Sequence, residues 1–238
     1  VAGTVRAFYK WAILEEESPE RTLHVFAGHG ELLPFQSLVD ALNRAGGGYA
    51  LCLSSPVSSI EALPEAYRQA DRCTQRAYMR PLRGLQRYAD PSAACGALLS
   101  RTVEEIRALR EKRLFPLIGP VVQRYLERLA SLPEAGREEV LQGMQGIAAQ
   151  MEGLEMEGLE LCADFDAASA EFSRRAVRCA REMLEKAVGF PVSRAIHYIM
   201  ENFAQPVSVP EIARAAFVSA SHLSYLFRQS LDCSIKQY

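Results

Sequence analysis

The sequence predicts an α+β chain, in which an α/β unit is followed by a mainly α-helical region that ends in a helix-turn-helix. Three observations support this prediction. Short apolar runs typical of strands alternate with helical patterns only before residue 92. Apolar residues then recur at helical spacing as far as residue 190, and the remainder breaks into short, well-capped helical pieces. We therefore expect three regions, 1–91, 92–190 and 191–238.

The composition is that of a globular protein in a reducing compartment. Hydrophobic residues make up 49% of the chain and charged residues 24%. No apolar run approaches the ~20 residues that span a bilayer, and the six cysteines form no CxxC pair, so we expect a cytoplasmic protein without a disulfide framework or a zinc site. A net charge of −2 argues against a protein that coats nucleic acid, but it is compatible with a small DNA-reading module. The chain starts at Val1 rather than Met, which indicates a piece of a longer protein.

The first region combines β-leaning runs with two helical patterns. The acidic run 15–17 is interpreted as a solvated face or loop. Strands are expected at 22–27, 49–55 and 84–90, and helices at 33–45 and 59–79. The order strand, helix, strand over 49–90 predicts an α/β unit.

The second region is helical throughout, with one exception. Helices are expected around 98–115, 121–132 and 166–189, with Gly189 ending the last of them and an aspartate near its start, Asp164 or Asp166, acting as a cap. The tandem repeat MEGLEMEGLE at 151–160 contains two glycines, each of which costs a helix about 1 kcal/mol relative to alanine. We interpret it as a loop or frayed helix end that serves as a hinge.

The third region carries the clearest helix-boundary signals. A helix over 192–203 is expected to place Ile196, Ile199, Met200 and Phe203 on its apolar side. Ser208 and Glu211 then form a capping box for a helix over 209–217, with Pro210 in the first turn.

That second helix is expected to turn Ile212, Ala213 and Ala216 inward, and the two alanines allow a neighbouring helix to come close. Ser219 is expected to cap a third helix over 220–231. Leu223, Leu226 and Phe227 would be its buried residues.

The outer face of this third helix is polar. Its free side chains are expected to be Ser221, His222, Ser224, Tyr225, Arg228 and Gln229. Two helices joined by a turn of about four residues, the second one polar on its outer face, match the helix-turn-helix plan, whose second helix enters the major groove of DNA. An ordinary helical hairpin with a solvated face is the alternative.

The amino-acid sequence of this stretch resembles that of the AraC/XylS family of bacterial transcription regulators. The resemblance lies in Ile-Ala at 212–213, Val-Ser at 218–219, HLSYLF at 222–227 and SIKQY at 234–238, the start of a following helix. It implies that the protein is a homodimer that binds double-stranded operator DNA. The implied DNA-binding residues are Ser219, Ser221, His222, Ser224, Tyr225, Arg228 and Gln229.

The chain departs from the family pattern in three respects. The family usually has Gly where Asp232 stands, although Asp tolerates the left-handed conformation better than most residues. Pro is common at the position of Ala220, and Arg is frequent at that of Tyr225. The family carries two such motifs joined by a long helix, and this chain ends at Tyr238, where that helix would begin. We therefore expect this piece to bind DNA weakly.

Residues 49–90 resemble the last strand, helix and strand of degenerate GGDEF-like domains, some of which precede AraC-type DNA-binding domains. The resemblance lies in the Ser-Pro-Val turn, EAYRQAD and RYAD. It implies a partial, non-catalytic regulatory or dimerisation module, because Gly48 and Tyr49 stand where the acidic pair would be. Receiver or sensor domains are the usual upstream companions in such regulators.

The sequence as a whole predicts a transcription regulator rather than an enzyme, with no cofactor and no metal. A signal received upstream would pass through the helical region to the DNA-binding helix. The alternative is a ligand-binding sensor or a protein–protein scaffold that keeps the helix-turn-helix shape without binding DNA.

Overall fold

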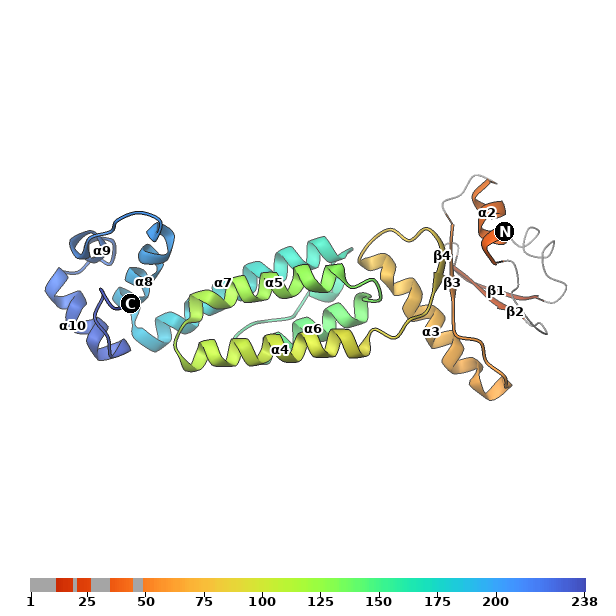
Figure 1. The fold of residues 1–238 in the computed structure, drawn as a ribbon, viewed down its shortest axis with the longest axis horizontal. Helices are drawn as coiled ribbons and strands as arrows, with labels where there is room; N and C mark the ends of the chain where they lie inside the picture. The colour runs from red at the N-terminus through yellow and green to blue at the C-terminus, as the bar shows by residue number, and fades with distance from the viewer. Residues whose placement is uncertain (1–11, 19–20, 27–34, 45–48) are drawn as a thin grey trace. The chain divides into compact units, whose positions relative to one another are not determined.

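A computed structural model describes residues 12–18, 21–26, 35–44 and 49–238. The chain divides into two compact units, with the boundary between Asp90 and Pro91 (Figure 1). The chain is mostly helical with a small parallel sheet, which confirms the predicted α+β character at a coarse level. Within these described ranges, no helix is both long enough and apolar enough to cross a membrane.

Within its described residues, the first unit contains two separate two-stranded sheets. Its elements are β1 (Ala12–Ser18), β2 (Arg21–Phe26), α2 (Phe35–Arg44), β3 (Ala50–Leu53), a short 3-10 turn (Ile60–Ala62), α3 (Leu63–Gln75), a second 3-10 turn (Arg76–Tyr78) and β4 (Gly84–Arg87). Strands β1 and β2 pair antiparallel. This pairing places the acidic run 15–17 within β1, so the run is not the loop that the sequence analysis offered as one of two interpretations.

The predicted strand–helix–strand unit is confirmed. Strands β3 and β4 pair in parallel, with Ala50 opposite Gly84, and α3 makes the connection between them. Helix α3 packs against β3, while α2 packs against β4 through a face that buries Leu38 and Val39. Pro64 stands in the first turn of α3, where its missing N–H leaves no helical bond unmade.

The second unit begins with four helices that pack side by side (Figure 1). They are α4 (Ser92–Glu111), α5 (Ile118–Ser131), α6 (Arg137–Ala148) and α7 (Phe165–Val188), with short 3-10 turns at Phe115–Leu117 and Leu159–Leu161. Asp164 caps α7 as predicted, since its Oδ1 accepts a hydrogen bond of 2.9 Å from the backbone of Ala167. Helix α7 ends at Gly189, whose φ of 79° suits a residue without a side chain.

A glycine in α6 leaves room for a tyrosine side chain of α5. Tyr125 of α5 is buried, and a Cβ atom added to Gly143 of α6 would lie only 1.8 Å from its Oη. Burial of the phenol, the main cause, raises the pKa of Tyr125. The contact between the two helices thus depends on the absence of a side chain at residue 143.

The repeat MEGLEMEGLE forms the loop that the sequence predicts, and its two copies share one pattern. Gly153 and Gly158 both have positive φ, of 89° and 80°, and the leucines that follow them, Leu154 and Leu159, are both buried. Each five-residue unit therefore makes a turn and then returns one side chain to the core.

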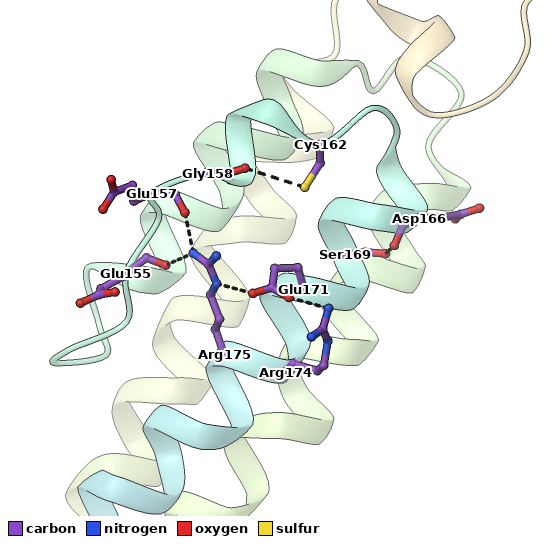
Figure 2. A network of polar contacts seen from close by, with 9 residues as sticks. All are labelled: Glu155, Glu157, Gly158, Cys162, Asp166, Ser169, Glu171, Arg174 and Arg175. Atoms are coloured by element: carbon purple, nitrogen blue, oxygen red, sulfur yellow. Dashed lines mark hydrogen bonds and ion pairs between the residues drawn. The ribbon is translucent and has the colours of Figure 1, made fainter.

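Arg175 of α7 holds this loop in place (Figure 2). Its Nη1 donates hydrogen bonds of 3.1 Å and 2.8 Å to the carbonyl oxygens of Glu155 and Glu157, and its Nε donates one of 2.7 Å to Glu171. The neighbouring Arg174 also pairs with Glu171, but its side chain is 75% exposed against 20% for Arg175. These contacts, with the buried leucines, oppose the predicted hinge at this loop.

Replacing Gly143 with alanine should lower the free energy of unfolding by about 1–3 kcal/mol, because the new methyl group overlaps the Tyr125 phenol. Gly96→Ala in α4 is the matched control, since a Cβ there meets nothing within 4 Å and gains up to about 1 kcal/mol of helix propensity. Urea unfolding followed by circular dichroism measures both. Equal effects at the two positions would contradict the packing described here.

Replacing Arg175 with methionine should raise the amide exchange rate of residues 151–160 and destabilise the second unit, because it leaves two backbone carbonyls without their donor. Arg174→Met removes the same charge from an exposed pair, which contributes little. Hydrogen exchange read by mass spectrometry distinguishes the two variants. Faster loop exchange in Arg174→Met than in Arg175→Met would overturn the role assigned to Arg175.

Candidate nucleic-acid interface

Three short helices follow α7, namely α8 (Phe190–Asn202), α9 (Val209–Ala215) and α10 (Ala220–Leu231). The predicted capping box of α9 is present, since the Glu211 carboxylate accepts hydrogen bonds of 2.8 Å from the Ser208 amide and 2.7 Å from its hydroxyl. These hydrogen bonds, the largest cause, hold the pKa of Glu211 below its usual value. Helix α10 is capped as predicted by Ser219, whose Oγ accepts from the His222 amide at 3.2 Å.

Small side chains bring α9 and α10 together. Ile212, Ala213 and Ala216 of the α9 segment are buried, as the sequence predicts. Opposite them, α10 buries Leu223 and Phe227 completely, whereas Leu226 is only half-buried. The two helices are therefore held by an apolar contact that leaves one whole face of α10 outside it.

The turn between α9 and α10 contains a phenylalanine in the left-handed conformation. Phe217 has φ of 59°, which costs a side-chain-bearing residue about 1–2 kcal/mol. The backbone N–H groups of Phe217 and Val218 donate to the carbonyls of Arg214 and Ala213, each at 3.1 Å, which is the Schellman pattern of a helix end. These bonds satisfy the last carbonyls of α9 and set the direction of α10.

Arg194 of α8 fixes this turn from outside. Its guanidinium carbon lies 4.6 Å from the ring centroid of Phe217 and 5.6 Å from that of Phe190, both within cation–π range. Its Nε also donates a 3.1 Å hydrogen bond to the carbonyl of Ala215. A single side chain thus ties α8 to α9 and to the strained turn.

The outer face of α10 presents most of the side chains predicted for it. Ser221, His222, Tyr225, Arg228 and Gln229 are exposed, with 62% of Tyr225 accessible. Their spacing of three or four residues places them on one side of the helix. No residue of α10 is acidic, and Arg228 gives its face a positive charge.

One of the predicted contact residues is placed differently. Ser224 is half-buried, and its hydroxyl donates a 2.8 Å hydrogen bond to the carbonyl of Ala220, so it is not the free side chain that the sequence predicts. Ser219 is exposed, and its Oγ accepts the capping bond that the sequence predicts. The prediction for Phe203 in α8 is also wrong. The sequence places this residue on the apolar side of the helix, but α8 ends at Asn202 and the ring is 81% exposed.

The C-terminal end of α10 is tied to the four-helix part of the unit. Arg113, in the connection after α4, donates from Nη1 to the carbonyl of Ser230, and the Ser230 hydroxyl donates to the Val188 carbonyl at 3.4 Å. Asp232 ends α10 with φ of 57°, which confirms that aspartate occupies the left-handed position here. The backbone then makes a further helical turn, capped by a 2.9 Å hydrogen bond from the Ser234 amide to Gln237.

Sequence reasoning missed Arg113 and Arg194. The contact of Arg113 joins residues 117 positions apart, and no local pattern indicates such a pair. Arg194 has a weak local signal, since it stands four residues after Phe190 on the same helix, where a cation and an aromatic ring can meet.

Neither a metal-binding cluster among the described residues nor a match to a known protein points to another site. Among the described residues, no group of three or more His, Cys, Asp or Glu side chains is arranged to hold a metal ion. Comparison with protein-family models, with curated proteins and with solved structures gives no match. The α9–α10 pair is therefore the candidate site on its own geometry.

Replacing Ser219 with alanine should destabilise the α10 segment by about 1 kcal/mol, because the N-terminal amides lose their cap. Ser221→Ala, two residues further on and exposed, should change stability by less than about 0.5 kcal/mol. Amide exchange of residues 220–231 measures the difference. Equal protection in both variants would show that the cap does not hold the helix.

Proposed function

We propose that this chain is part of a bacterial transcription regulator and that α10 reads DNA in the manner of an AraC-type helix-turn-helix. The observation that carries the proposal is the exposed polar face of α10, held by an apolar contact to α9 on its opposite side. A helix presented in this way has the width that the major groove accepts.

The chemistry of the face suits DNA. Ser221, His222 and Tyr225 offer hydrogen-bonding groups in the N-terminal half of α10, the part of a recognition helix that meets base edges. Arg228 and Gln229 lie one turn further on, where they would contact a base or a phosphate. The lack of acidic residues in α10 avoids repulsion of the phosphate backbone.

The rest of the chain is assigned a regulatory role under the same proposal. Region 1–91 acts as a degenerate GGDEF-like module, supported by the parallel β3–α3–β4 arrangement. The helical region relays its state through the contacts of Arg113 and Val188 with Ser230. Two copies of the chain would place two recognition helices on two DNA half-sites.

DNA binding is tested with the 238-residue chain and a pool of random-sequence duplexes. Repeated selection should enrich a preferred sequence, and fluorescence anisotropy should show that its affinity falls steeply with salt, because phosphate contacts release counterions. Arg228→Ala and His222→Ala should each weaken binding to the selected duplex by about 1–3 kcal/mol for a base contact, or reduce the salt slope by about 1 for a phosphate contact.

Arg174→Ala is the matched control, because it removes the same charge from α7, about four turns before that helix ends. It should leave affinity and salt slope unchanged. If no sequence is enriched, or if the α10 variants bind as well as the control, α10 is architectural and the chain is a sensor or scaffold.

A further inference from the structure

Two cysteines of the first unit lie together in its interior. Cys52 stands in β3 and Cys73 in the last turn of α3, which packs on that strand. The pKa of Cys73 is lowered chiefly by a hydrogen bond with the Cys52 thiol, so the two side chains interact. They are 21 positions apart in the chain, so the fold and not the local sequence brings them together.

A buried arginine lies beside this pair. Arg76 is only 6% exposed, and its Nη1 and Nη2 donate to the carbonyls of Arg87 and Ala89 at 3.0 Å and 3.1 Å. Its Nε is buried and has no hydrogen-bond partner among the described residues. The guanidinium is therefore a fixed positive charge that favours a thiolate next to it.

The two thiols differ in accessibility. Cys73 has no exposed surface, whereas Cys52 is half-buried and in contact with solvent. The hydrogen bond from Cys52, which is the main cause, and the charge of Arg76 outweigh burial and lower the pKa of Cys73 to about 7. A reachable thiol thus stands next to a protected one that is readily ionised.

We propose that Cys52 and Cys73 form a thiol–disulfide couple that low-molecular-weight disulfides oxidise. The Cys52 thiolate attacks one sulfur of the reagent, whose S–S bond breaks, and the first leaving thiol takes up the proton that Cys52 lost. The Cys73 thiolate then attacks Cys52 Sγ, breaks the mixed disulfide, and releases the second reagent thiol with the proton from Cys73. Two electrons pass from the cysteine pair to the reagent.

The other cysteines lack this combination. Burial, the main cause, raises the pKa of Cys95 to about 11 and also raises that of Cys179. Cys162 and Cys233 are half-buried, but neither is described in contact with a second thiol. Solvent accessibility alone therefore does not distinguish Cys52 from Cys162 and Cys233. These two cysteines serve as controls within the same chain.

The test treats the full chain with glutathione disulfide at neutral pH, blocks the remaining thiols and digests with trypsin. Arginines at 44, 68, 72 and 76 place Cys52 in peptide 45–68 and Cys73 in peptide 73–76, so a disulfide between them links two peptides of distinct mass. We expect this linked species to be the main disulfide product. Its absence, or a wild-type product that stops as a mixed disulfide on Cys52, would overturn the proposal.

Single variants test the order of the two steps. Cys73→Ser should retain one glutathione on Cys52, because the resolving thiolate is gone, whereas Cys52→Ser should leave Cys73 reduced. The double variant Cys162→Ser/Cys233→Ser should form the linked peptides at the wild-type rate. Glutathione on Cys73 in the Cys52→Ser protein would contradict the assigned order, and the wild-type measurement remains decisive should a serine variant fail to fold.

Discussion

The second unit depends on the burial of one long face of α7. From Phe165 to Val188 this helix turns Ala168, Phe172, Ala176 and Leu184 into the core, where they meet α5 and α6. Each large apolar side chain buried in this way contributes about 1.5–3 kcal/mol. The same helix also supplies Arg175, which holds the 151–160 loop, and the Val188 carbonyl, which accepts from Ser230. The core, the 151–160 loop and the terminal helices thus all contact one helix, α7.

The turn between α9 and α10 shows how strain is accommodated in the terminal helices. A glycine would adopt the conformation of Phe217 without cost, but it would offer no ring to Arg194. The aromatic ring converts an unfavourable backbone conformation into an attachment point for α8. In this protein the geometry of the helix pair is therefore secured by a contact from a third helix rather than by the turn alone.

Local signals predicted much of this arrangement. The caps at Asp164, Ser208 and Ser219 each depend on hydrogen bonds to amides within a few positions, and so they can be read from the sequence. The left-handed Asp232 follows from side-chain sterics in the same way. Contacts that join distant segments, such as Arg113 with Ser230, leave no periodic signal. Ser224 was misjudged for another reason, since its own helix offers the Ala220 carbonyl as a competing partner.

Gly189 is both the last cap of α7 and the first of α8, so one backbone position joins the four-helix part to the terminal helices. Helix α8 extends ~20 Å from that position, at 1.5 Å per residue. A rotation of about 10° there would move its far end by roughly 3.5 Å, and the contacts of Ser230 with Arg113 and Val188 oppose such a rotation. Loss of these two contacts would therefore let small torsional changes at one glycine displace α10 by several ångströms.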